Sequence, residues 1–368
     1  MKAAIPKETA EGETRVAAVP DTVAKLRAGG IEVWVQAGAG QGAHFSDELY
    51  RQAGATVTYE LGDLYANADI VLRVQPPAEG ELGALPPGSV LICMLQAHLH
   101  PQLLESLATA DITAFALERL PRISRAQPMD VLSSQASIAG YKAALLGADH
   151  LDKILPMQMT AAGTLAPARA LILGAGVAGL QAIATARRLG AVVEAFDVRS
   201  AVREEVQSLG AKFINVEVEA AEGAGGYARE QSKEQLQRQQ DLLTERVAAA
   251  DIVISTASIP GRSAPTLITT DMVTAMRKGS VIVDVAADTG GNCECSVPGE
   301  VITFDDVVIV AIKDLARLVP HHASLTYSRN LSNLVLSLMH EGEFTIDLDD
   351  EVVDAICVTH KGELRYGG

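Results

Sequence analysis

Basic residues and long apolar stretches are scarce in this chain. Its 30 Lys and Arg stand against 46 Asp and Glu, which gives a formal net charge of −16. Because nucleic-acid phosphates are bound by clustered Lys and Arg, this balance argues against a nucleic-acid partner. No apolar run approaches the roughly 18 residues needed to cross a bilayer, and residues 1–13 turn polar too early for a signal peptide. We therefore expect a globular protein in the cytoplasm.

Cysteine is equally scarce, with four residues in a chain of 368, as suits a reducing compartment. Cys93 and Cys357 lie in apolar stretches and are predicted to be buried thiols. Cys293 and Cys295 form an isolated C-x-C that no second pair of ligands accompanies. Since a structural metal site needs such a second pair, we predict no metal site.

Short apolar runs alternate with helical patterns along most of the chain. Its earlier half contains a predicted helix at 21–30 and predicted strands at 3–6, 31–38, 68–74, 89–95 and 112–117. Its later half contains a predicted helix at 178–190 and predicted strands at 168–174, 191–197, 250–256, 280–286 and 307–312. This order is typical of parallel sheets covered by helices on both faces.

A weak internal sequence repeat supports the presence of two related domains. ADIVLRVQPP (68–77) followed by PGSVLICM (87–94) resembles ADIVISTASIP (250–260) followed by KGSVIVDV (278–285). Two doubly wound domains of the same kind are the simplest explanation.

Long helices are predicted at 130–151 and 328–342, each expected to cross between the domains, and a strand at 351–359 is expected to return to the first domain. The predicted fold is therefore α/β, with two Rossmann-like doubly wound domains, a cleft between them and long joining helices. The predicted domains are a discontinuous first domain, 1–132 plus 326–368, and a second Rossmann domain, 133–325.

The strongest motif is a glycine pattern in LILGAGVAGLQ (171–181). Gly174, Gly176 and Gly179 form G-x-G-x-x-G directly after a predicted strand and before a predicted helix. The first glycine permits a tight turn, the second lets a pyrophosphate approach the backbone, and the third lets the helix pack on the strand. Val177 and Ala178 lie inside the motif and are expected to contact the same ligand.

An acidic residue completes this dinucleotide fingerprint. Asp197 ends the next predicted strand, 18 residues after Gly179. Its carboxylate can accept hydrogen bonds from an adenosine ribose and would repel a 2′-phosphate, so NAD is favoured over NADP. Val198 and Arg199 follow it and are expected at the same site, where Arg199 can soften that repulsion.

Three other segments bear on the site. The long polar segment 217–240 has Tyr227 as its only aromatic residue, and we predict that it is a lid over the nucleotide. Residues 258–265 follow a strand end, where ligands bind in this architecture, so Ile259 and Gly261 are expected near the nicotinamide half. A second glycine cluster at 37–44 lacks a following helix pattern and is predicted to be a plain loop.

One stretch is dense in hydrogen-bonding groups but has no proton shuttle. PRISRAQPMDVLSSQ (121–135) contains two arginines, two glutamines, an aspartate and three serines, without lysine, histidine or cysteine.

With TAAGTLAPARALILGAGVAGLQAIATARRLGA (160–191), SIPGRSAP (258–265) and GGNCECSVPGE (290–300), this stretch makes the chain resemble a known family. The family is the NAD(H)-binding component, domain I or the separate alpha-1 subunit, of proton-translocating nicotinamide nucleotide transhydrogenase. The resemblance runs from Met1 to about Gly362.

The resemblance implies a set of catalytic polar residues around the nicotinamide: Arg122, Gln127, Asp130 and Ser133. It also implies that Tyr227 is the tyrosine of a mobile loop and that Asp197 is the ribose carboxylate. Hydride transfer between two nicotinamides moves no proton, so side chains that orient the ring suffice. Two departures stand out: Pro128 replaces a residue that is more often Ser, and 312–324 follows the family pattern loosely.

The resemblance further implies partners. We expect a homodimer that binds NAD(H) and exchanges hydride, with Si-specific/Re-specific geometry, with NADP(H) on a partner domain III. A membrane domain II would couple this transfer to proton translocation. The chain would then lie at the cytoplasmic face of the inner membrane, held there by its partner subunits.

Two alternatives remain open. An alanine dehydrogenase-like enzyme, a relative with the same architecture, needs proton-handling Lys and His residues, whereas the matching positions hold Arg73 and Gln96. Arg15 matches a carboxylate-binding arginine of those enzymes and does not discriminate. The other alternative, a regulatory NAD sensor, would need only the adenosine side of the site and leaves the polar cluster at 121–135 unexplained.

Overall fold

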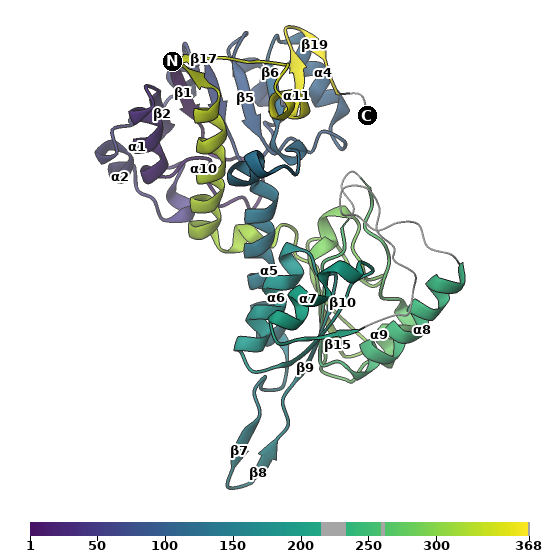
Figure 1. Ribbon diagram of the computed structural model, residues 1–368. Helices are drawn as coiled ribbons and strands as arrows, with labels where there is room; N and C mark the ends of the chain where they lie inside the picture. The colour runs from purple at the N-terminus through teal and green to yellow at the C-terminus, as the bar shows by residue number, and fades with distance from the viewer. Residues whose placement is uncertain (215–232, 259–261, 367–368) are drawn as a thin grey trace. The chain divides into compact units, whose positions relative to one another are not determined.

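The chain folds into two compact units (Figure 1). The computed structural model describes residues 1–214, 233–258 and 262–366. The first unit consists of Met1–Gln135 and Arg317–Gly368, and the second consists of Ala136–Ala316. The first unit is therefore built from both ends of the chain.

The first unit contains an eight-stranded sheet in the order β19-β18-β6-β5-β4-β1-β2-β3. Strands β1 to β6 run parallel, and β18 joins β6 in antiparallel fashion. The strands are β1 (Lys2–Ile5), β2 (Glu32–Gln36), β3 (Thr56–Thr58), β4 (Ile70–Leu72), β5 (Val90–Cys93), β6 (Thr113–Ala116), β18 (Cys357–His360) and β19 (Glu363–Leu364).

The second unit contains a seven-stranded sheet in the order β11-β10-β9-β12-β13-β15-β14, with only β14 antiparallel. Its strands are β9 (Arg169–Leu173), β10 (Val192–Phe196), β11 (Lys212–Ile214), β12 (Ile252–Ser255), β13 (Val281–Asp284), β14 (Val301–Phe304) and β15 (Val307–Val310). Both sheets follow the same doubly wound path. The two similar sequence segments occupy corresponding places, because β4 and then β5 follow β1 in the first sheet as β12 and then β13 follow β9 in the second.

Helices cover these sheets. Those of the first unit are α1 (Pro20–Ala28), α2 (Asp47–Gln52), α3 (Leu61–Tyr65), α4 (Pro101–Thr109), α10 (Pro320–Ser337) and α11 (Glu351–Ile356). Those of the second are α6 (Val177–Arg188), α7 (Arg203–Ser208), α8 (Lys233–Ala249) and α9 (Thr270–Ala275). Helix α5 (Val131–His150) begins in the first unit and ends in the second. No helix of the described residues is long and apolar enough to cross a membrane.

Each sheet is buried on both faces, as parallel sheets usually are. Ile70 and Leu72 of β4 join one apolar cluster, whereas Val71 between them joins another. In β9, Ile172 and Leu171 separate in the same way. Alternate residues of a strand point to opposite faces. The residues of each continuous apolar run therefore contribute to two hydrophobic cores, one on each face of the sheet.

Two predicted elements need correction. The segment 351–359 is not one strand, because its beginning forms α11 and only its end forms β18. Asp350 starts that helix, since its carboxylate accepts the backbone N–H groups of Val352 and Val353. The helix predicted at 328–342 is α10, which begins earlier, at Pro320, and ends at Ser337. It lies entirely within the first unit, so the prediction that it crosses between the domains is wrong.

Two short hairpins complete the described structure. One is formed by β16 (Met339–His340) and β17 (Glu343–Phe344), and the other by β7 (Gln158–Thr160) and β8 (Gly163–Leu165). The β7–β8 hairpin projects well beyond the sheet of the second unit (Figure 1). Cys93 and Cys357 are buried, as predicted.

Candidate functional site

The polar motif at 121–135 forms the entry to α5 in the first unit. Asp130 stands immediately before the helix, and its carboxylate accepts the backbone N–H of Ser133 at 2.9 Å and the Ser133 hydroxyl at 2.5 Å. A carboxylate at this position satisfies one of the free N–H groups of a helix start. Two of the four predicted nicotinamide residues are thus in direct contact, and each is half-buried.

The other two predicted residues precede the helix. Gln127 lies on a short 3-10 helix, η4 (Ser124–Met129), and its side chain is exposed, as is that of Arg122. Arg125, which lies between them, forms an ion pair with Asp350 at 2.5 Å. The motif therefore contains one arginine committed to the fold of the first unit and further polar groups that face solvent.

The glycine motif forms the loop between β9 and α6 in the second unit. Gly174 has φ +94, which favours glycine, and a Cβ there would lie 2.7 Å from Thr256 Oγ1. A Cβ on Gly179 would lie 1.9 Å from the Gly174 carbonyl oxygen. At Gly176 a Cβ would meet nothing within 4 Å. Two glycines are therefore required by the fold itself, and the middle one opens onto the free space that a pyrophosphate needs.

Asp197 ties the end of β10 to this loop. Its carboxylate accepts the Ala175 N–H at 2.7 Å and the Arg199 N–H at 2.8 Å. The Arg199 guanidinium lies 3.0 Å from both carboxylate oxygens. The arginine is thus placed to offset the negative charge that a ribose phosphate would meet. Val177 and Ala178 begin α6, and Val198 packs partly buried beside the core.

Three predicted contacts, Tyr227, Ile259 and Gly261, lie outside the described residues, so their placement remains a prediction. The polar motif and the glycine motif lie in different units, and each set of contacts is internal to its own unit.

The sequence analysis did not identify Asn292, the residue whose side chain shapes the loop after β12. Asn292 is fully buried, and its amide bonds to both backbone groups of Ala257 and to the Pro265 carbonyl, at 2.8–3.0 Å. The buried carboxylate of Asp284 accepts the backbone N–H groups of Asn292 and Cys293. These contacts hold the described residues on either side of 259–261. Asn292 belongs to the quoted segment GGNCECSVPGE, which was the only signal for it.

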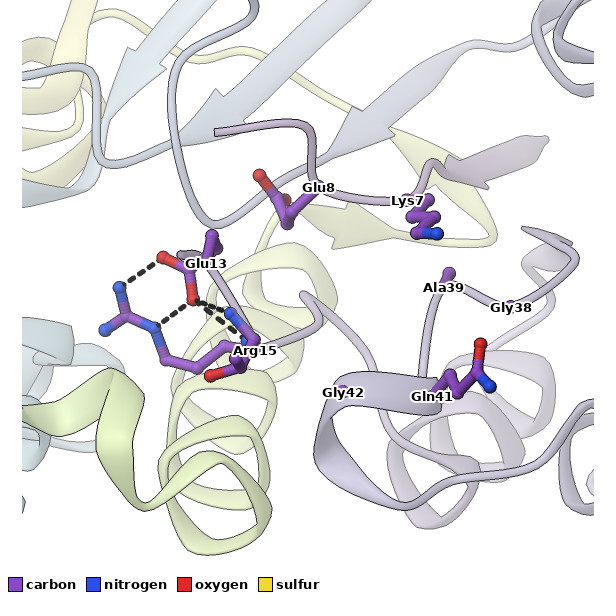
Figure 2. A pocket seen from close by; sticks show the side chains of 9 residues that line it. Lys7, Glu8, Glu13, Arg15, Gly38, Ala39, Gln41 and Gly42 are labelled. Atoms are coloured by element: carbon purple, nitrogen blue, oxygen red, sulfur yellow. Dashed lines mark hydrogen bonds and ion pairs between the residues drawn. The ribbon is translucent and has the colours of Figure 1, made fainter. Parts of the chain in front are cut away.

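A cavity of about 280 Å³ in the first unit was also missed (Figure 2). Its lining follows the ends of β1 and β2, where ligands bind in doubly wound sheets. The glycine cluster at 37–44, predicted to be a plain loop, supplies one wall. The lining residues are Lys7, Glu8, Glu13, Thr14, Arg15, Gly38, Ala39, Gln41 and Gly42.

Arg15 and Glu13 are tightly paired in this cavity. Arg15 is buried and donates to both carboxylate oxygens of Glu13, at 2.6 and 2.8 Å (Figure 2). It also donates to Gln135 Oε1 at 2.9 Å. Burial by itself raises the pKa of Glu13, but hydrogen bonds and charge from Arg15 outweigh it and lower the pKa to about 2. Gln135 lies on α5 just after Ser133, so the cavity and the polar motif share one helix.

Glu8 is the second carboxyl group of the cavity. It is buried and accepts the Val74 N–H at 2.7 Å, and Arg73 lies 3.8 Å away. Burial raises the pKa of Glu8 to about 7, against the opposing charge of Arg73. The segment 121–135 has no proton shuttle, but the first unit does contain a carboxyl group that titrates near neutrality. The only sequence signal for Glu8 is a lone glutamate after a predicted strand. This pattern is too common in proteins to single the residue out.

Comparison with known proteins covers both units. The family model described as alanine dehydrogenase/PNT, N-terminal domain, matches residues 4–139. The model described as alanine dehydrogenase/PNT, C-terminal domain, matches residues 143–367.

Of the described residues, no group of three or more His, Cys, Asp and Glu is arranged to hold a metal ion.

Individual relatives align over nearly the whole chain. A protein of Rhodospirillum rubrum, named as one part of NAD(P) transhydrogenase subunit alpha, is 46% identical over 376 residues, which cover 100% of this chain and 98% of that protein. The crystal structure of transhydrogenase from Sinorhizobium meliloti has 43% identity and a TM-score of 0.91, and covers 99% of this chain and 100% of that one. An alanine dehydrogenase of Mycolicibacterium smegmatis is 30% identical, with 99% of this chain and 94% of that protein covered.

The three glycines are expected to respond differently to alanine. Gly179→Ala should destabilise the fold by about 1–3 kcal/mol, because its methyl group meets the Gly174 carbonyl. Gly176→Ala should leave the melting temperature unchanged, since its φ of −78 suits alanine and the space is open, but should weaken NADH binding at least about tenfold. Thermal unfolding and titration calorimetry with NADH separate the two effects. A Gly176→Ala variant whose melting temperature falls together with its NADH affinity would contradict this assignment.

The raised pKa of Glu8 predicts a pH-dependent contribution to stability. Its folded pKa of about 7 exceeds the ordinary 4.5, so the folded state holds this proton more tightly than the unfolded state. The stabilisation is complete below about pH 4.5 and is lost as the pH rises through about 7. Relative to a Glu8→Gln variant, the wild type should therefore lose up to about 3 kcal/mol between pH 4.5 and 8.

Urea unfolding followed by the fluorescence of Trp34, the single tryptophan, reports on the first unit. Glu79→Gln, a change at an exposed carboxyl on the same unit, is the control. A constant difference in free energy of unfolding between wild type and Glu8→Gln across this pH range would rule the interpretation out.

Proposed function

Because this chain belongs to the alanine dehydrogenase/PNT family, we propose that it is the NAD(H)-binding subunit of a proton-translocating nicotinamide nucleotide transhydrogenase. It exchanges hydride directly with NADP(H) held on domain III of a partner. A membrane domain II couples this exchange to proton translocation. The two units are proposed to be the two Rossmann-like domains of that subunit.

The glycine loop is the observation that carries the proposal. Gly176 leaves open space at the start of α6, and the backbone N–H groups there can hold a pyrophosphate. The Asp197 carboxylate ends the adjacent strand and can accept hydrogen bonds from the adenosine ribose, which favours NAD over NADP. Val177, Ala178, Val198 and Arg199 are proposed to surround this half of the cofactor. Tyr227 is proposed to belong to a lid over the nucleotide, and Ile259 and Gly261 are proposed to lie near the nicotinamide half.

The polar motif of the first unit suits the other half. The nicotinamide, when bound, supplies or accepts the hydride, so the protein must hold the ring rather than move a proton. Asp130 and Ser133 are fixed by their mutual hydrogen bonds, while Gln127 and Arg122 present exposed polar ends. Orientation of this kind can contribute about 7–11 kcal/mol to lowering a barrier. We propose Si-specific/Re-specific transfer between the two nicotinamides.

The proposed partners follow from the same assignment. The relative from Rhodospirillum rubrum bears the name of one part of an alpha subunit, which supports a multi-subunit enzyme. We propose that this chain meets domain III and membrane domain II at the cytoplasmic face of the inner membrane. The net charge of −16 is unsuited to direct adhesion to anionic lipid, so that location requires the partners.

A homodimer is proposed through the β7–β8 hairpin of the second unit. This hairpin exposes Met157 by 61%, Met159 by 78% and Leu165 by 50%. A two-stranded hairpin is marginally stable by itself in water, and apolar side chains on it favour packing against another surface. The occupant we propose is a second copy of this chain.

An alanine dehydrogenase-like activity is the second candidate, favoured by the cavity that contains Arg15 and Glu8. Two observations weigh against it. The Arg15 guanidinium already binds the Glu13 carboxylate and Gln135. Arg73, at a position where the related dehydrogenases have a proton-handling lysine, is fully buried and paired with Glu81 at 2.8 Å.

Hydride transfer to a separate partner tests the main proposal. Mixed with a transhydrogenase NADP-binding domain, the protein should transfer hydride rapidly from NADH to NADP⁺, with both proteins required and no membrane present. Arg122→Ala should slow this transfer at least about tenfold, because a side chain that orients the ring is lost. Single-turnover stopped-flow absorbance measures the rate when NADP⁺ is replaced by an analogue, such as thio-NADP⁺, whose reduced form absorbs at a different wavelength from NADH.

Arg125→Ala is the matched control, since it removes a nearby arginine whose charge is paired with Asp350. Its transfer rate should stay close to that of the wild type. Tight NADH binding without any transfer to an active partner domain would reject the transhydrogenase proposal. Turnover with alanine or pyruvate would then support the second candidate.

The dimer proposal makes its own prediction. A Met157→Asp, Met159→Asp double variant should shift the protein from dimer to monomer in sedimentation velocity, because two exposed apolar side chains that the proposed interface would bury are replaced by charge. Gln158→Glu, which adds a charge to the opposite face of the hairpin, should leave more dimer than the double variant. A monomeric wild type at the same concentrations would refute the dimer, as would a double variant that dimerises normally.

A further inference from the structure

The backbone between Gln127 and Asp130 carries a carbonyl group that its own helix does not satisfy. The last turn of η4 closes with the Asp130 N–H donating to the Gln127 carbonyl at 3.2 Å. Pro128 lies within this turn, contributes no N–H and has its φ fixed by its ring. The Pro128 carbonyl instead accepts two side-chain amides, Asn330 Nδ2 at 2.8 Å and Asn333 Nδ2 at 2.9 Å.

Both amides come from one face of α10, where residues three apart are neighbours. They are separated from Pro128 by 202 and 205 residues of sequence, so two distant parts of the first unit meet at a single oxygen. A carbonyl oxygen has two lone pairs, and two donors saturate it. The carbonyl is therefore fixed in direction as well as in place.

The orientation of one amide is itself set by a third segment. Lys25 of α1 donates from Nζ to Asn333 Oδ1 at 2.7 Å. Lysine can only donate, so this contact identifies the oxygen of Asn333 and turns its NH₂ group toward Pro128. Helices α1 and α10 thus act together on the turn before α5.

We propose that Asn330 and Asn333 are positioning residues, which hold the turn that carries Gln127 and Asp130 in the conformation needed for hydride transfer. The inference rests on the proposed function for its effect on rate. Gln127 directly precedes the clamped Pro128, and Asp130 caps α5 two residues after it. Rotation of the Pro128 peptide would therefore move Gln127 and release the cap that Asp130 makes with Ser133.

The test compares Asn330→Ala, Asn333→Ala and the double variant with Arg329→Ala, a change at an exposed residue of the same helix. Lys25→Met is a further probe, because it leaves both amide donors in place but frees the orientation of Asn333. Three quantities are measured: the single-turnover rate of hydride transfer to a partner NADP-binding domain, the NADH dissociation constant, and hydrogen exchange of backbone amides at 126–134 without nucleotide.

The double variant should lose about tenfold or more in transfer rate, since small displacements of a reacting group are costly. Its NADH dissociation constant should change by less than about threefold, because the adenosine contacts belong to the second unit. Exchange at 126–134 should accelerate, while exchange in the core of α10 and the melting temperature stay near those of Arg329→Ala. Asn333→Gln, which keeps an amide donor, should recover part of the rate.

Three outcomes would overturn the proposal: unchanged exchange at 126–134 in the double variant, an unchanged transfer rate, or equal losses of rate, NADH affinity and melting temperature, which would indicate a general structural role. A wild-type protein that transfers no hydride would instead reject the proposed function. The exchange measurement does not depend on that activity and still decides whether the two amides hold the turn.

Discussion

The close approach of α6 to the end of β9 is the constraint on which the nucleotide site depends. Gly179 has no room for a side chain against the Gly174 carbonyl, and that same carbonyl accepts the Thr256 hydroxyl at 3.0 Å. Asp197 reaches the loop from the other side through the Ala175 N–H. Three neighbouring strands, β10, β9 and β12, thus end on one loop. Its shape is set by the fold before a ligand arrives, and binding need not pay to order it.

The first unit depends on a different constraint, which is that charged side chains are buried in it. Arg15 and Arg73 are both fully buried, and each is met by carboxylate groups, Glu13 for the first and Glu81 and Glu8 for the second. Removing one partner of such a pair leaves an uncompensated charge, so these groups constrain one another strongly. The region beside the polar motif is therefore held by ion pairs, whereas the glycine loop is held by backbone packing.

Local patterns predicted the inner strands of both sheets and the glycine turn, because those features follow from runs of neighbouring residues. The edge strands β3, β11, β14 and β19 were not predicted. The similarity between residues 68–94 and 250–285 was also found in the sequence, and it corresponds to matching strands of the two sheets. The predictions were wrong where one polar side chain decided the outcome, as with Asp350, whose cap converts 351–356 into helix. Contacts between distant segments could not be predicted at all: nothing near Pro128 in sequence indicates Asn330, and nothing near Arg15 indicates Gln135.

The matching order of the two sheets has a consequence for how such a chain arises. An internal duplication followed by divergence leaves two copies with one path and different chemistry. In the second copy, the segment after the first central strand, β9, became a glycine loop, and the next strand ends at Asp197. In the first copy, the corresponding segments after β1 and β2 line the cavity with Glu8, Glu13 and Arg15. The same position in the fold, after the first two strands, thus carries a glycine loop in one unit and a cavity lined by charged groups in the other.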